Sequence, residues 1–113
     1  AELAFTYQGE GIRERVAELA AEFGAAPLFP CDVADDAQID ALFAGLAAHW
    51  PEGLDGLVHA IAFAPREALK GEFHESVTRD AFHIAHDISS YSLAALAKGA
   101  APLMKGRAGG RFS

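Results

Sequence analysis

Two polar side chains follow short apolar runs, at positions where a parallel sheet binds its ligands. Gln8 comes directly after residues 2–7, and Asp32, followed by Val33, comes directly after residues 27–31. A carboxylate beside an unpaired backbone N–H can match the amino group and the ring nitrogen of adenine, and Gln8 could hydrogen-bond a ribose or a phosphate. The alternative is that Asp32 only orders the turn into the next helix. The residues alone leave both interpretations open.

A small and apolar segment, HAIAFAP, occupies residues 59–65 after a third apolar run. The loop beyond a strand is normally polar, so this composition favours a wall where an apolar ligand can approach the backbone. The alternative is an ordinary apolar turn that is covered by the loop at 63–77.

His83, His86 and Asp87 share one helix face at i, i+3 and i+4, which could bring metal ligands together. No other group of Cys or His supports them, so a solvated or packed helix face is favoured and we expect no metal site.

Ser89, Ser90 and Ser92 form a stretch rich in hydroxyls within a predicted helix. A serine nucleophile needs a strained elbow between a strand and a helix, which is missing here, so we interpret the three serines as packing residues. No pair of residues in the chain forms a convincing catalytic acid and base.

Short apolar runs alternate with apolar residues at helical spacing, and this pattern predicts the elements that position these residues. We expect strands at 2–7, 27–31 and 54–61, the start of a fourth strand at 110–113, helices at 11–23, 36–50 and 79–104, and a loop at 63–77. Asp35 and Gln38 form a predicted capping box, and Thr78 is the expected N-cap of the last helix. The alternation predicts a doubly wound α/β fold with a parallel sheet.

Composition and charge exclude several classes of protein. The net charge of −7 opposes binding to nucleic acid and to anionic membranes. No apolar run approaches the ~20 residues of a membrane helix, and the N-terminus lacks the layout of a signal peptide, so a cytoplasmic protein is expected. A single cysteine, Cys31, excludes an intramolecular disulfide framework. The chain opens without Met and stops as a strand begins, so we expect a piece of a longer protein.

Four stretches cover nearly the whole chain: AELAFTYQGE, PCDVADDAQIDALFAGL, LDGLVHAIAFAPREALKGEF and AFHIAHDISSYSLAALAKGAAPLMKGR. Together, and in this order, they resemble the NADH-dependent enoyl-[acyl-carrier-protein] reductases of bacterial type II fatty acid synthesis. These enzymes belong to the short-chain dehydrogenase/reductase superfamily. The resemblance implies that residues 1–113 are one partial domain with a three-layer, Rossmann-like sheet. The first strand with its glycine-rich turn, and the C-terminal part, would lie outside the chain.

The resemblance also implies a cofactor site for NADH. It places Gln8 near the adenosine ribose, Asp32 and Val33 at the adenine, and the backbone of Ile61 against the cofactor. The acidic residue that would separate NADH from NADPH is missing, so the residues themselves leave NADPH open.

For the enoyl-acyl-carrier-protein substrate, the resemblance implies a contact with Ala64, while Phe63 and Leu69 flank the acyl chain. The tyrosine and the lysine that such reductases use would lie beyond Ser113. We therefore expect no catalytic residue in these 113 residues, and we expect the isolated chain to be inactive.

Ile84, Ile88 and Tyr91 form a second apolar strip on the helix at 79–104, and this strip predicts a subunit contact. Packing beneath the loop at 63–77 is the alternative. The resemblance implies a homotetramer.

Two other functions stay open: a short-chain reductase that acts on a ketone or an alcohol, and a non-catalytic nucleotide-binding module. HAIAFAP counts against the first, which typically has Asn-Asn-Ala-Gly at this point.

Overall fold

The computed structural model describes residues 2–61, 63–106 and 111–112. The chain divides into two compact units, Ala1–Glu52 and Gly53–Ser113. The single partial domain over 1–113 stays a prediction. Residues 110 and 113 of the predicted last strand lie outside the described residues.

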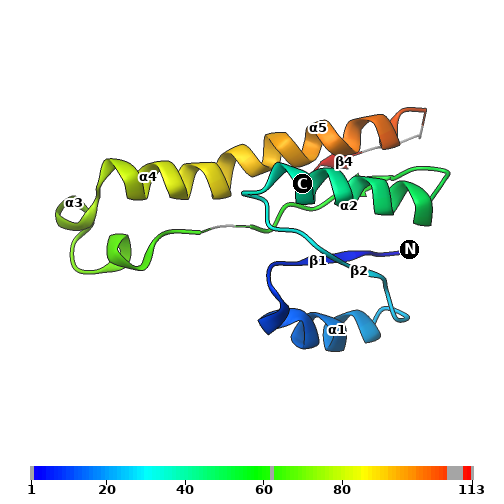
Figure 1. Cartoon of the computed structure of the whole chain (residues 1–113), viewed down its shortest axis with the longest axis horizontal. Coiled ribbons are helices and arrows are strands. Elements are labelled where there is room, and N and C mark those ends of the chain that lie inside the picture. Colours follow the sequence, from blue (N-terminus) through cyan, green and yellow to red (C-terminus); the bar gives the residue numbers. More distant parts are fainter. Residues whose placement is uncertain (1, 62, 107–110, 113) are drawn as a thin grey trace. The chain divides into compact units, whose positions relative to one another are not determined.

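The first unit is a pair of parallel strands with a helix on each face. Strand β1 (Phe5–Tyr7) pairs with β2 (Leu28–Pro30), with Phe5 opposite Leu28 and Tyr7 opposite Pro30. Helix α1 (Arg13–Ala21) and helix α2 (Asp36–His49) lie on opposite sides of this pair (Figure 1). The predicted helix at 11–23 is shorter than expected, because its first residues belong to a single 3₁₀ turn at Glu10–Ile12.

Helix α2 begins where the sequence predicts and carries most of the core of this unit. The Asp35 side chain accepts a hydrogen bond from the Ala37 N–H at 2.9 Å, which caps the first turn. The predicted capping box is altered, because Gln38 Oε1 accepts from the Asp32 N–H at 2.8 Å instead of from the N-cap residue itself. The helix buries four apolar side chains: Ile39, Leu42, Phe43 and Leu46.

In the second unit, β3 (Gly56–Leu57) pairs in parallel with β4 (Arg111–Phe112). The predicted strand at 54–61 is therefore regular over only two residues, although the Leu54 N–H still bonds to the Leu103 carbonyl at 2.9 Å. The predicted loop at 63–77 is not wholly irregular, since it contains a 3₁₀ helix at Arg66–Leu69 and a short helix, α3. Helix α3 covers Phe73–Ser76.

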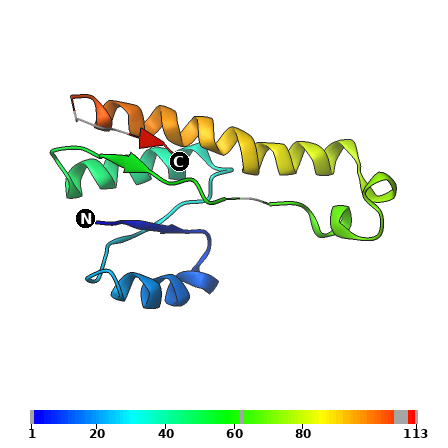
Figure 2. The same ribbon diagram turned by 180° about the vertical axis from the view of Figure 1, so that it is seen from behind.

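The long helix expected at 79–104 is present but interrupted. Helix α4 (Arg79–His86) is capped by Thr78, whose hydroxyl accepts from the Ala81 N–H at 3.1 Å, as predicted. A π turn at Asp87–Tyr91 then leads into α5 (Ser92–Met104), and the ribbon runs on without a break between the two helices (Figure 2). Helix α5 buries one face against its own unit, and the buried residues are Ser92, Leu96, Ala100 and Met104.

Parallel strand pairs packed with helices confirm the predicted α/β class. Among the described residues the strands form two separate two-stranded sheets, β1–β2 and β3–β4. Short strands are expected in such pairs, because a strand that has a neighbour on one side only gains half of the ladder hydrogen bonds of a central strand.

Candidate functional site

The carboxyl ends of β1 and β2 bring two predicted site residues to one edge of the strand pair. The Cys31 N–H donates to the Tyr7 carbonyl at 2.9 Å, which extends the parallel pairing by one step. Gln8 and Asp32, the next residues along each strand, therefore both lie just beyond this edge. Gln8 is exposed and Asp32 is half-buried.

The turn at Asp32 is held by hydrogen bonds on three of its polar groups. Its N–H donates to Gln38 Oε1 at 2.8 Å, its carbonyl accepts from the Asp35 N–H at 3.0 Å, and Oδ1 accepts from the Ala34 N–H at 3.0 Å. Asp32 does order the turn, as the alternative interpretation required. Within the part of the chain that the structure describes, Asp32 Oδ2 and the Val33 N–H have no hydrogen-bond partner.

Asp32 Oδ2 and the Val33 N–H leave one acceptor and one donor free on adjacent residues. The amino group and the neighbouring ring nitrogen of adenine offer the complementary donor and acceptor. Both residues are half-buried, so solvent competes for these groups less than on an open surface. The arrangement therefore fits the adenine of a dinucleotide.

Cys31 is a buried free cysteine beside this turn. Burial raises the pKa of its thiol, and the carboxylates of Asp32 and Asp35 raise this pKa further. A raised pKa leaves less of the reactive thiolate at any given pH below it.

We expect Cys31 to react slowly with an alkylating reagent at about pH 8, and its rate to keep rising at pH values where an ordinary cysteine has levelled off. Mass spectrometry of the peptide that contains Cys31 measures this rate in native and in denatured protein. The Asp35→Asn variant keeps a helix cap but removes one carboxylate, so it should react faster than the parent. Equal rates in the native and denatured states would contradict the prediction.

The predicted acyl-contacting residues lie in the second unit, around the segment after β3. Ile61 and Ala64 are half-buried, whereas Phe63 is 47% and Leu69 is 70% exposed. Leu69 ends the 3₁₀ helix at Arg66–Leu69, which follows Pro65. Phe63 and Leu69 are thus exposed apolar side chains, whereas Ile61 and Ala64 are partly covered.

Two serines that the sequence interpretation treated as packing residues hold this segment by hydrogen bonds. Ser89 Oγ accepts from the Phe63 N–H at 2.9 Å and donates to the Phe63 carbonyl at 3.2 Å. Ser92 Oγ lies 2.8 Å from His59 Nε2 and also donates to the Ile88 carbonyl. Ser89 and Ser92 therefore make hydrogen bonds that the packing interpretation did not include, and Ser92 is also fully buried.

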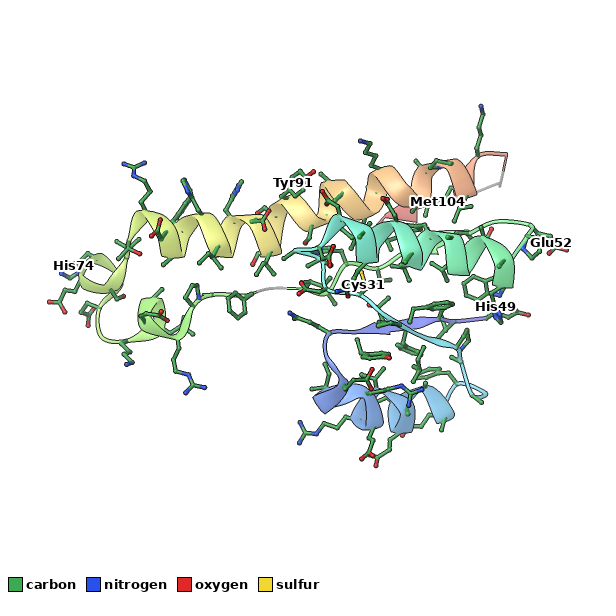
Figure 3. The ribbon with its side chains drawn as sticks, in the orientation of Figure 1. Cys31, His49, Glu52, His74, Tyr91 and Met104 are labelled. Atoms are coloured by element: carbon green, nitrogen blue, oxygen red, sulfur yellow. The ribbon has the colours of Figure 1, made fainter. Side chains whose placement is uncertain are left out.

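Tyr91 ends the π turn and is exposed, and it points outward from the helix (Figure 3).

Among the described residues, no group of three or more His, Cys, Asp or Glu side chains could hold a metal ion. None of the helices in the described part of the chain has the length and apolar character needed to cross a bilayer.

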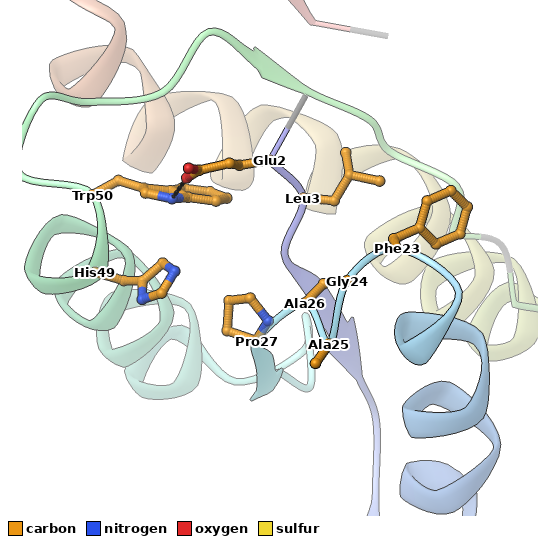
Figure 4. Close-up of a pocket in the computed structure, with 9 residues that line it drawn as sticks. All are labelled: Glu2, Leu3, Phe23, Gly24, Ala25, Ala26, Pro27, His49 and Trp50. Carbon is orange, nitrogen blue, oxygen red and sulfur yellow. Dashed lines mark hydrogen bonds between the residues drawn. The ribbon is translucent and has the colours of Figure 1, made fainter.

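A hollow of about 420 Å³ lies at the other end of the β1–β2 pair (Figure 4). Trp50 Nε1 donates to Glu2 Oε2 at 2.7 Å across one side of it, and Phe23 and Pro27 line it as well. Ligands of parallel sheets gather at the carboxyl ends of strands, and this hollow lies at the amino ends. It is therefore not the predicted cofactor site.

Comparison with known proteins agrees with this geometry. The family model described as enoyl-(acyl carrier protein) reductase matches residues 1–112. An enoyl-[acyl-carrier-protein] reductase [NADH] of Neisseria meningitidis serogroup B is 57% identical over 107 residues, which cover 95% of this chain and 41% of that protein. The corresponding enzyme of Escherichia coli K12 is 54% identical over 98 residues, which cover 87% of this chain and 37% of that protein.

Solved structures give the same result. The enoyl-[acyl-carrier-protein] reductase (NADH) of Aquifex aeolicus superposes with a TM-score of 0.86 at 45% identity, covering 93% of this chain and 44% of that one. The reductase of Anaplasma phagocytophilum, solved in complex with NAD, has a TM-score of 0.83 at 39% identity. The match covers 92% of this chain and 39% of that one. The chain thus spans about two fifths of the length of the relatives it matches. It belongs to the enoyl-(acyl carrier protein) reductase family.

Proposed function

We propose that the full-length protein containing this chain is an NADH-dependent enoyl-[acyl-carrier-protein] reductase that acts on trans-2-enoyl thioesters in fatty acid biosynthesis. Residues 1–113 would supply the adenine end of the cofactor site and part of the acyl pocket wall. The observation that carries the proposal is the free Asp32 Oδ2 beside the free Val33 N–H at the carboxyl edge of β1 and β2.

Four residues of this chain contact the cofactor in this proposal. Asp32 and Val33 hold the adenine, Gln8 bonds the adenosine ribose, and the Ile61 backbone contacts the cofactor. Gln8 is suited to the ribose because it is exposed and follows β1 directly, at the same edge as Asp32. When bound, NADH supplies the hydride for the reduction. This chain's own part is to bind and orient the cofactor.

The acyl pocket wall consists of Phe63, Ala64 and Leu69. A fatty acyl chain needs an apolar surface with room for a flexible hydrocarbon, and it needs few polar groups near the alkene. Phe63 and Leu69 are exposed apolar side chains, and burying them against an acyl chain would remove that surface from water. The relative from Neisseria meningitidis is an enoyl-[acyl-carrier-protein] reductase, which supports an enoyl-acyl-carrier-protein substrate.

We also propose that the protein is a cytoplasmic homotetramer. Four large apolar side chains of the helix at 79–104 are exposed among the described residues: Phe82, Ile84, Tyr91 and Leu93. They include two residues of the apolar strip that the sequence assigns to a subunit contact, and a subunit interface would bury them. Light scattering on the full-length protein should give a tetramer, and a monomer at micromolar concentration would contradict this proposal.

An assay of the full-length protein tests the activity. Loss of NADH absorbance should depend on a trans-2-enoyl thioester, and mass spectrometry should find the saturated thioester as the product. A 3-oxoacyl thioester is the control, because a ketone-reducing relative of the same fold would consume it. Reduction of the ketone without reduction of the enoyl compound would contradict the proposal. The 113-residue chain alone is expected to be inactive in the same assay.

A further inference from the structure

The backbone of Phe63 has both of its polar groups bonded to one side chain. Ser89 Oγ accepts from the Phe63 N–H at 2.9 Å and donates to the Phe63 carbonyl at 3.2 Å. A serine hydroxyl has one hydrogen to donate, so this pair of bonds commits that hydrogen to Phe63. Phe63 belongs to no helix or strand, and these two bonds are what fix its backbone within the described part of the unit.

The π turn presents Ser89 and Ser92 to the same segment. Ser92 donates its hydrogen to the Ile88 carbonyl, so its bond to His59 requires His59 to donate from Nε2. The helix thus holds the segment at two points, at the side chain of His59 and at the backbone of Phe63. π turns within α-helices occur frequently at functional sites.

We propose that Ser89 is a positioning residue for the acyl pocket. It acts through Phe63, whose backbone it holds, and through Ala64, which follows directly. The proposal rests on the function proposed above, because it assumes that Phe63 and Ala64 contact an acyl chain. Ser89 does not touch the substrate. Its role is to keep the wall at a fixed distance from the alkyl chain, so its loss weakens the binding of long acyl chains.

The test uses the full-length protein and the Ser89→Ala variant. With a twelve-carbon trans-2-enoyl thioester, KM should rise about tenfold, equivalent to about 1.4 kcal/mol, while kcat should stay within about twofold. With a four-carbon thioester the change in KM should be much smaller, because a short chain does not reach the wall. The NADH dissociation constant should change much less, since Ser89 bonds Phe63 and not Ile61, which is the residue of this segment assigned to the cofactor.

Two further variants separate positioning from general structural damage. Ser89→Thr keeps the hydroxyl and should restore the KM for the long thioester. Ser90→Ala removes an exposed neighbouring hydroxyl that has no bonding partner among the described residues, and it should behave as the parent. If Ser89→Ala does not fold, Ser89→Cys replaces it, because a thiol has a similar size but bonds weakly.

An unchanged KM for the long thioester in Ser89→Ala would overturn the proposal, and so would an equal rise for both chain lengths. Failure of Ser89→Thr to restore KM would do the same. A parent protein that reduces no enoyl thioester would instead contradict the proposed function, so the two failures are distinct.

Discussion

Replacing Asp32 with asparagine in the full-length protein is expected to weaken NADH binding by roughly 10- to 100-fold. The carboxylate accepts at both oxygens, and Oδ1 is already used by the Ala34 N–H at 3.0 Å. An asparagine can keep that bond through its own oxygen, and its NH₂ group then replaces Oδ2. Two donors, this NH₂ and the adenine amino group, would then face each other. Isothermal titration calorimetry measures the change in the dissociation constant.

Asp36→Asn is the matched control, since Asp36 carries the same charge four residues further on and is exposed in the first turn of α2. It should bind NADH as the parent does. The hypoxanthine analogue of NADH adds a second check, because its 6-oxo group accepts where adenine donates. The penalty of Asp32→Asn should therefore be smaller for the analogue. Equal penalties for the two dinucleotides would show that Asp32 does not contact the base.

The largest loss of stability is expected from Leu46→Ala, at about 2–5 kcal/mol in the free energy of unfolding. Leu46 lies on the buried face of α2 and is 7% exposed. Truncation removes apolar surface from the core and leaves a cavity that the surrounding side chains fill only in part. Urea unfolding followed by circular dichroism measures the change on the full-length protein.

Leu19→Ala is the same chemical change on α1, at a side chain that is 57% exposed. It should cost less than about 1 kcal/mol, because the side chain gives up little buried surface. Similar losses for both variants would mean that α2 does not form the core described here.

The features predicted best from sequence depend on local chemistry. The N-caps at Asp35 and Thr78 were identified from residue type and spacing, and both side chains accept the expected hydrogen bonds. Helix α2 ends at His49, one residue before the predicted end. A cap and an apolar stripe are set by residues within one or two turns of each other, so a single sequence contains the necessary information.

The features that were missed depend on residues far apart in the chain. Ser89 bonds Phe63, 26 residues away, and Ser92 bonds His59, 33 residues away. Nothing in the periodicity of the helix at 79–104 marks these partners. A cluster of hydroxyls opposite an unusually apolar loop was the available signal, because such a loop still has backbone groups that need partners. The sequence predicts a strand at 54–61, but β3 covers only Gly56–Leu57. The length of a strand depends on its pairing partner, and the partner of β3 is β4, more than 50 residues away.

The sequence predicts which residues form the candidate adenine turn, and their role in binding stays a prediction, but it does not predict the hydrogen bonds that hold the turn. Gln38 was expected to complete the helix cap, yet its Oε1 accepts from the Asp32 N–H at 2.8 Å while its Nε2 donates to Asp35 Oδ2 at 3.2 Å. One side chain therefore links the beginning of α2 to the candidate adenine turn. Residue spacing alone does not distinguish these two roles, because both bonds lie within reach of the same amide.

The π turn at Asp87–Tyr91 also limits how this chain can vary in length. A π turn corresponds to one residue inserted into an α-helix, and each residue of an α-helix turns the chain by about 100°. Deleting a residue from a regular α-helix would rotate everything beyond it by that angle, whereas deleting one from the π turn would only remove the bulge that absorbs the extra residue. The buried face of α5, with Leu96 and Ala100, would then keep nearly the same direction. Ser89 lies inside the bulge, so the deletion would instead disturb its two bonds to the Phe63 backbone and with them the proposed acyl pocket wall.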